Sequence, residues 1–130
     1  MADADASMAI ATAADLLQAY AQGQRAFVNA NLPSANLAEA NLKGADLSYA
    51  DLSEANLRET NLRGADLSYA NLREADLTGA DLRGAMLIGT DLRLAQVTNA
   101  QFHDADYDPE ETHFPPGFDP TAAAMRSDRP

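Results

Sequence analysis

The chain contains no cysteine and no tryptophan, and it is poor in bases. Its 130 residues include nine lysines and arginines, two histidines and twenty acidic residues, for a net charge of −11. The lack of cysteine excludes disulfides, thiolate metal sites and cysteine nucleophiles. Direct binding to nucleic acid is disfavoured, because neutralising phosphates requires clustered Lys and Arg.

Long hydrophobic runs are also missing. No stretch approaches the roughly 20 apolar residues that a membrane span requires, and the first residues lack a basic segment followed by an apolar core. We therefore expect a cytoplasmic protein with no membrane partner, built as one domain.

Instead, the chain has a leucine or a substitute for it at every fifth position. Two residues before each centre stands Ala or Thr, and the residue between is Asn or Asp in thirteen of sixteen units. Period five fits neither an amphipathic helix nor a half-buried strand. Within a unit, Ala and Leu share one face of a short extended segment, Asn or Asp points outward, and two variable residues form the corner. The centres are Leu32, Leu37, Leu42, Leu47, Leu52, Leu57, Leu62, Leu67, Leu72, Leu77, Leu82, Leu87, Leu92, Val97, Phe102 and Tyr107.

The pattern A(N/D)LXX resembles the pentapeptide-repeat family over about 80 of the 130 residues. The resemblance implies an all-β solenoid, a right-handed, quadrilateral parallel β-helix. A second period supports four sides, since KGADLSYA at 43–50 returns as RGADLSYA at 63–70. The flank DLLQAYAQGQRAF at 15–27 is similar to N-terminal segments of this family, whose members are especially abundant in cyanobacteria.

The flanks of the repeat predict caps. Thr12 with Asp15 forms a capping-box pattern and Gly23 is a stop signal, which predicts a helix over 13–22 with Leu16, Leu17 and Tyr20 on its apolar face. The whole chain then divides into a disordered N-terminus at 1–11, a capping helix at 12–24, the β-helix of about four coils at 25–109, a C-terminal cap at 110–125 and a disordered tail at 126–130.

The C-terminal flank DPEETHFPPGFDP predicts the end of the ladder, because proline cannot donate to a sheet. Phe114 and Phe118 are expected to plug the last coil. Asp119 is expected to cap a short helix over 120–125, with Pro120 at its first position.

Sorting the repeat by position in the coil gives four walls of unequal chemistry. The wall centred on Leu47, Leu67, Leu87 and Tyr107 carries four aspartates and no base within 30–109. Apolar residues stand at its outward positions, which is typical of a protein-contact patch. Stacked tyrosines that only stabilise adjacent coils are the alternative. The candidate protein interface is Tyr49, Tyr69, Met86, Ile88, Asp46 and Asp66.

A second candidate surface is the wall that carries a net positive charge. The residues Lys43, Arg63, Arg83 and His103 recur in one column, twenty residues apart. Like charges one coil apart repel, and we expect Asp46 and Asp66 on the neighbouring wall to relieve this repulsion.

No catalytic site, metal site or cofactor is expected. His103 and His113 lack partners at metal-like or triad-like spacing. Asn and Asp interchange along the outward columns, which a metal ligand would not permit. We expect these side chains to bond along their columns instead.

The sequence therefore predicts a non-enzymatic scaffold that binds another protein. The resemblance adds one alternative, an acidic mimic of DNA that acts on DNA gyrase or another topoisomerase, as family members that protect gyrase are understood to do. A structural spacer and a homodimer also remain open.

Overall fold

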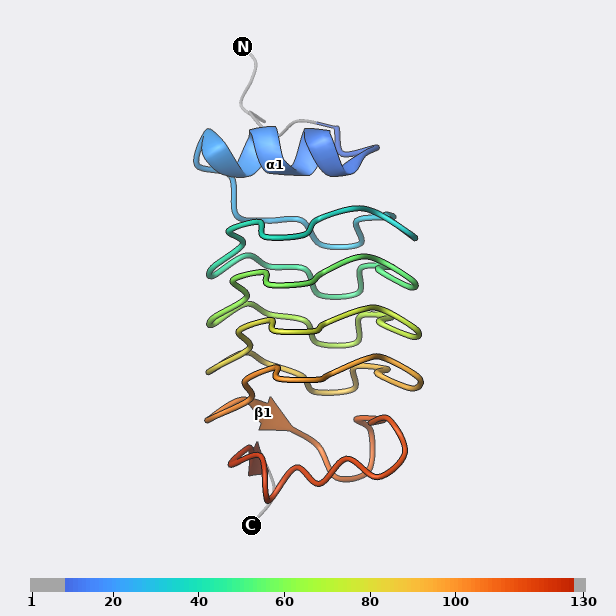
Figure 1. The fold of residues 1–130 in the computed structure, drawn as a ribbon. Coiled ribbons are helices and arrows are strands. Elements are labelled where there is room, and N and C mark those ends of the chain that lie inside the picture. The colour runs from blue at the N-terminus through green and yellow to red at the C-terminus, as the bar shows by residue number, and fades with distance from the viewer. Residues whose placement is uncertain (1–8, 128–130) are drawn as a thin grey trace.

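The computed structural model of the chain describes residues 9–127. Figure 1 shows a rod of stacked coils with a helix across one end and a pair of short strands at the other. Its named elements are α1 (Ala13–Ala21), β1 (Asp106–Tyr107) and β2 (Arg126–Ser127). Between them, adjacent coils are joined by single-residue parallel bridges rather than by long strands.

The bridges form four columns. They begin with the pairs Ala26↔Asp46, Asn31↔Asp51, Asn36↔Asn56 and Asn41↔Asn61, and the columns continue with pairs twenty residues apart as far as the pair of Asp91 with His113. The predicted coil of twenty residues is therefore confirmed, and each coil carries one bridge on each of four sides.

The interior is filled by the repeat's own side chains. Every leucine centre from Leu32 to Leu92 is buried, and Phe27 is a first centre that is only 3% exposed. Alanines two positions before the centres form the second inward layer, and Thr60 and Thr90 replace them without becoming exposed. Burying one leucine is worth about 2 kcal/mol, so each coil adds its own share of the stability.

Each corner is a turn with a left-handed residue. The alanine N–H donates to the carbonyl of the preceding leucine, as Ala35 does to Leu32 at 3.2 Å. The residue before each alanine has φ between 58° and 71° from Asn29 to Asp104. Glycine occupies only five of these corners, although other residues adopt this conformation at a cost. Leu94 is such a residue, and it is 54% exposed.

In most units the Asn or Asp accepts a hydrogen bond from its own corner. Asn36 Oδ1 accepts a hydrogen bond from the N–H of Ala38 at 3.2 Å, and Asp66 Oδ1 accepts one from Ser68 at 2.9 Å. The predicted bonding along the columns is thus replaced by local turns, which need only one side-chain oxygen. Both Asn and Asp supply this oxygen, and this explains why they interchange.

Helix α1 covers the first coil. Its capping box is present, with Thr12 Oγ1 accepting from Asp15 N–H and Asp15 Oδ2 accepting from Thr12 N–H. Leu16 is buried, Leu17 and Tyr20 pack on the core, and Tyr20 Oη donates to the Lys43 carbonyl at 2.7 Å. The predicted cap is therefore observed.

The predicted disorder of 1–11 is wrong for Ile10 and Ala11. Residues 1–8 lie outside the described residues. Ile10, however, packs against the core, and the Ala11 N–H donates to Asp15 Oδ2 at 3.0 Å. These contacts place Ile10 and Ala11 against the rest of the fold.

The C-terminal segment forms an irregular fifth coil, which the prolines were predicted to forbid. His113 pairs with Asp91 at an offset of 22 instead of twenty. Further along, β2 pairs with β1 in parallel, with Arg126 opposite Asp106. The prediction of a disordered tail is therefore wrong for Arg126–Ser127, while 128–130 lie outside the described residues. The prolines fall between these pairings, so they interrupt the ladder without ending it.

The C-terminal segment contains the predicted aromatic plug but not the predicted helix. Phe118 meets Phe102 edge to face at 5.0 Å, and Phe114 meets Tyr107 at 5.7 Å between ring centroids. The predicted aromatic plug is confirmed. The helix over 120–125 is wrong, because these residues form turns, although Asp119 Oδ1 does accept from the Thr121 N–H at 3.0 Å.

Thr112 compensates for the two extra residues on the first side of the fifth coil, before His113. Its hydroxyl donates to the Leu87 carbonyl at 2.7 Å and accepts from the N–H groups of Gly89 at 3.2 Å and Asp108 at 3.0 Å. In the regular coils the equivalent corner N–H donates to a carbonyl of the next coil, as Tyr69 does to Ile88. Thr112 is therefore a side-chain replacement for a missing backbone partner.

The interior predicts a sharp contrast between neighbouring positions. Leu67 is fully buried, so Leu67→Lys should cost about 3–5 kcal/mol by placing an unpaired charge in the core. Ser68→Lys, on the outer surface, should stay within about 0.5 kcal/mol of the parent. Urea unfolding followed by circular dichroism measures both, and equal midpoints would contradict this packing.

The fifth coil predicts a second contrast. Thr112→Val should cost about 1–3 kcal/mol, because it leaves buried donors without an acceptor. Thr90 is the matched control: its hydroxyl donates to the Leu67 carbonyl, which also accepts from Ala70. Thr90→Ala restores the usual repeat residue and should cost less than about 1 kcal/mol. A larger loss for Thr90→Ala than for Thr112→Val in urea unfolding would refute the role given to Thr112.

Candidate protein interface

The residues predicted to form an interface do lie on one wall, called the tyrosine wall here and defined by Asp46, Tyr49, Asp66, Tyr69, Met86 and Ile88. The bridges Asp46↔Asp66 and Asp66↔Met86 place these three residues in one column. Tyr69 N–H donates to the Ile88 carbonyl at 2.8 Å, so Ile88 lies one coil below.

The two tyrosines form a stacked pair on the outside of the rod. Their ring centroids are 5.3 Å apart and their planes are inclined by 15°. Tyr49 is 59% exposed, Tyr69 46% and Met86 42%, whereas Ile88 is half-buried. The wall therefore presents an apolar strip that crosses three coils.

Tyr69 is held from two further directions. A Cβ built on Gly89 would overlap the Tyr69 ring, so the ring lies against the bare backbone of this glycine. The Tyr69 hydroxyl donates to Glu111 Oε1 at 3.0 Å, and this hydrogen bond to a carboxylate raises the pKa of Tyr69. Neither contact of Tyr69 was predicted from the sequence. The contact with Gly89 could have been predicted, because Gly89 lies twenty residues after Tyr69 and therefore one coil below it.

The aspartates of the wall have a structural role and an exposed part. Asp46 Oδ1 accepts from the N–H of Ser48 at 3.0 Å and from its hydroxyl at 2.7 Å. Asp66 Oδ1 accepts from the N–H of Ser68. Both residues are partly exposed, and the second carboxylate oxygen of each adds negative charge beside the strip.

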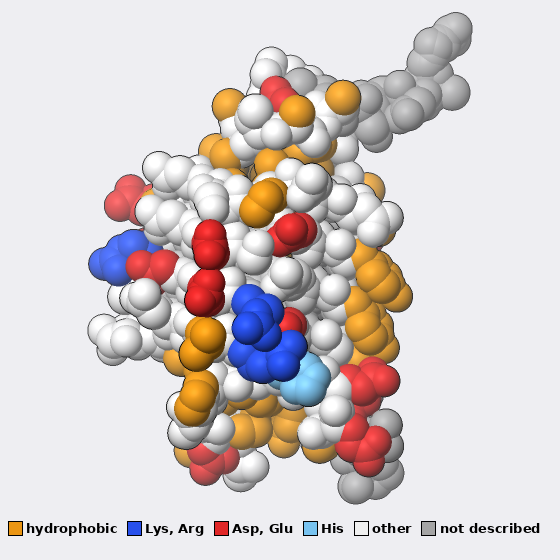
Figure 2. Space-filling model, turned by 90° about the vertical axis from the view of Figure 1, so that its right-hand side faces the viewer, with side chains coloured by type: hydrophobic (Ala, Val, Ile, Leu, Met, Phe, Trp, Pro, Cys, Tyr) orange, Lys and Arg blue, Asp and Glu red, His pale blue; other side chains and the backbone are white. Residues whose placement is uncertain are grey.

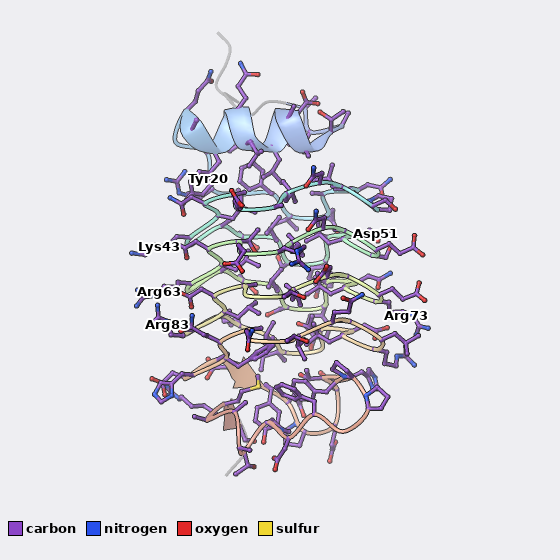
Figure 3. All side chains as sticks on the ribbon, viewed as in Figure 1. Tyr20, Lys43, Asp51, Arg63, Arg73 and Arg83 are labelled. Carbon is purple, nitrogen blue, oxygen red and sulfur yellow. The ribbon has the colours of Figure 1, made fainter. Side chains whose placement is uncertain are left out.

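The predicted basic column is present, and two of its members lie close to acidic residues of the same wall. Figure 3 shows Lys43, Arg63 and Arg83 one above another along one side of the rod. Arg83 Nη2 lies 2.7 Å from Asp81 Oδ2, and His103 Nε2 lies 3.6 Å from Asp104 Oδ2. Arg83 therefore pairs on its own wall. The relief of Lys43 and Arg63 by Asp46 and Asp66 stays a prediction, because no ion pair joins these residues in the described chain.

Another pair of arginines lies across the rod. Figure 2 faces the side where Figure 3 labels Asp51 and Arg73, and it shows basic side chains gathered there beside a hydrophobic edge. Arg93 Nη2 lies 2.8 Å and Arg73 Nη1 3.8 Å from Asp91 Oδ2. One carboxylate therefore neutralises part of this cluster, and ion pairs this exposed contribute little to stability.

Hydrogen bonding keeps several aspartates ionised. The side chain of Arg83 lowers the pKa of Asp81, that of Arg93 lowers the pKa of Asp91, and the Thr78 hydroxyl lowers the pKa of Asp76. All three are repeat aspartates that also accept from their own corner N–H. Charge and turn geometry therefore depend on the same oxygens.

Residues 9–127 show neither a cluster of metal ligands nor a membrane-spanning helix. In this range no three His, Asp or Glu residues come close enough to hold an ion. The same range contains no helix with the length and apolar character needed to cross a bilayer.

The lowered pKa values predict a loss of stability in acid. Because Asp81 and Asp91 have folded-state pKa values below the usual 3.8, their stabilisation is present above the unfolded pKa and is lost as pH falls through the folded one. Asp81→Asn with Asp91→Asn keeps the turn acceptors but removes this titration. The urea midpoint should fall less between pH 6 and pH 3 in this variant than in the parent. An equal fall would show that other groups control the acid transition.

Comparison with known proteins agrees with the repeat geometry. The profile of the family described as pentapeptide repeats matches eight copies, over residues 27–64, 55–93 and 75–106. No curated protein matches the chain. Members of this family form right-handed quadrilateral β-helices.

Solved structures of pentapeptide repeat proteins match this chain to different extents. The pentapeptide repeat protein alr5209 from Nostoc PCC 7120 is 51% identical, with a TM-score of 0.89 over 91% of this chain and 97% of its own. A pentapeptide repeat protein from the Arabidopsis thaliana thylakoid lumen is 37% identical, with a TM-score of 0.49 over 65% of this chain and 55% of its own. HetL, from Nostoc sp. strain PCC 7120 and involved in heterocyst differentiation regulation, is 40% identical, with a TM-score of 0.39 over 74% of this chain and 47% of its own. From the profile match and the likeness to alr5209, this chain belongs to the pentapeptide-repeat family.

Proposed function

We propose that this chain is a non-enzymatic rod, wound right-handed as in its family, that binds another protein through the tyrosine wall. The observation that carries the proposal is the exposed Tyr49–Tyr69 stack, with ring centroids 5.3 Å apart. The interior is already filled by leucine and alanine, so the fold does not require aromatic side chains on its outside.

The tyrosine strip is suited to binding because it is both exposed and ordered. Aromatic residues dominate the energetics of protein interfaces. Here the stack, the Gly89 backbone and the hydrogen bond to Glu111 fix the rings before any partner arrives. Ordering side chains in advance lowers the entropic cost of association.

The basic column is the weaker candidate. Lys43 and Arg63 are exposed, but a hydrated cation gains little from being covered. Exposed apolar surface, in contrast, is stabilised whenever a partner removes it from water. The tyrosine wall therefore has the larger driving force.

The DNA-mimic alternative is the weaker one, because the repeat carboxylates already have partners within the rod. Asp46, Asp66 and Asp76 each use Oδ1 to hold their own turn, and Asp81 and Asp91 are paired with arginines. Regular columns of carboxylates therefore serve the fold first, and they do not require a DNA-binding partner to explain them.

A comparison of two walls tests the proposal. Tyr69→Ser with Ile88→Ser should reduce recovery of bound protein from native lysate by tenfold or more, roughly the effect of losing one aromatic hot spot. Lys43→Ser with Arg63→Ser is the matched control, because neither base forms an ion pair with another residue of the described range 9–127. Quantitative mass spectrometry of the captured proteins gives the readout.

Two further measurements separate binding from folding. Thermal unfolding of each variant shows whether the rod is intact, and Tyr69→Phe removes only the hydrogen bond to Glu111. Loss of capture in the Lys43 and Arg63 variant alone would assign binding to the basic column. Loss of stability without loss of capture in the Tyr69 and Ile88 variant would leave the stack a purely structural role.

A further inference from the structure

Taking the proposed function as its basis, we infer that the tyrosine wall receives a cationic amphipathic α-helix of the partner, laid parallel to the long axis of the rod. Two independent features of the wall favour this ligand, the spacing of its apolar groups and the sign of its charge.

The spacing of the strip matches a helix better than an extended chain. Successive coils rise by about 4.8 Å, and the Tyr49 and Tyr69 rings are 5.3 Å apart. A helix repeats one face every 5.4 Å or so, whereas an extended segment repeats a face about every 6.7 Å. Over the two steps from Tyr49 to the coil of Ile88, a helix drifts by about 1 Å and an extended segment by about 4 Å. Only the helix keeps one apolar side chain on each coil.

The charge of the wall selects a cationic helix. The segments 45–50, 65–70 and 85–90, which build its three coils, contain no lysine and no arginine. Asp46 and Asp66 flank the strip on one side, and Glu111 accepts from the Tyr69 hydroxyl at its lower end. In the coil below the strip, Arg126 Nε lies 3.7 Å from Asp106 Oδ1. Arginine can also lie on a tyrosine ring, as Arg25 does on Tyr20 at 3.6 Å within this chain.

Net charge decides between a separate partner and a second copy. Each chain carries −11, so bringing two copies together side by side opposes association at ordinary ionic strength. A basic helix gains from the same field. The occupant is therefore a helix of a different protein, with apolar residues at i, i+3 or i+4, and i+7, and with Lys or Arg beside them.

Designed peptides supply the test, with the full chain as receptor. The probe is a fluorescent fifteen-residue peptide with leucines at helical spacing and arginines on both flanks. Its controls are a peptide of the same composition in which leucine and arginine alternate, a scrambled peptide, and a copy with glutamate in place of arginine. Fluorescence anisotropy measures affinity, and circular dichroism measures helix formation on binding.

We expect the helical probe to bind at least tenfold more tightly than each control peptide and to gain helix when bound. Tyr49→Ser with Tyr69→Ser should weaken it by tenfold or more. Asp46→Asn with Asp66→Asn should weaken it by roughly three- to tenfold. This change leaves the turns intact, because Asn56 and Asn61 fill the same role elsewhere in the chain. Glu39→Gln with Glu59→Gln removes two charges from the other side and should have little effect.

Several outcomes would overturn the inference. Equal binding of the scrambled peptide would indicate charge attraction alone, and tighter binding of the alternating peptide would indicate an extended ligand. Tighter binding of the glutamate peptide would reverse the assigned charge. Sedimentation that shows a peptide-independent dimer, broken by Tyr49→Ser with Tyr69→Ser, would assign the wall to a second copy.

The two proposals can fail separately. If the Tyr69 and Ile88 variant loses its lysate partner while the helical probe neither binds nor competes, the wall binds protein but not a basic helix. If that variant keeps every partner, the proposed function itself is wrong.

Discussion

Registration of each coil on the previous one at an offset of twenty residues is the constraint on which this structure depends. A leucine N–H donates to the coil below and an Asn or Asp N–H donates to the coil above, as Leu47 and Asp66 do. A strand of one bridging residue has almost no stability alone. All sides must therefore stack together, and any insertion must be compensated locally, as Thr112 does in the fifth coil.

The corners carry the cost of this regularity. A turn every five residues requires a left-handed residue, and in most units it is not glycine. The strain is balanced by a fixed set of bonds: the alanine N–H to the leucine carbonyl and the corner N–H to Asn or Asp. Since these bonds use backbone atoms and one side-chain oxygen, the two variable positions stay free to differ. The outside of the rod can therefore change while the inside remains constant.

The sequence was sufficient for most of the fold because the fold is local and periodic. Leucine spacing gave the coil, and Thr12 with Asp15 gave the cap of α1. Prediction failed where the period breaks. His113 pairs with Asp91 at an offset of 22, and Arg126 returns to the offset of twenty from Asp106 although the residues between these pairings lack the leucine repeat. The column of Tyr49 and Tyr69 followed from the period, but the bond from Tyr69 to Glu111 did not, because it crosses 42 residues into the irregular coil.

A filled interior moves any specificity to the outer surface, where two kinds of side chain behave differently. Carboxylates and arginines can satisfy each other within the rod, and Asp81 with Arg83 does so. An exposed tyrosine ring cannot be neutralised by a neighbouring charge in this way. The stack of Tyr49 on Tyr69 covers only one face of each ring. Tyr69 therefore rests against Gly89 below and Tyr49 above, while Tyr49 itself stays 59% exposed. A rigid, half-covered aromatic surface beside unpaired negative charge is a better starting point for recognition than a larger but mobile one, because less order must be created when a partner binds.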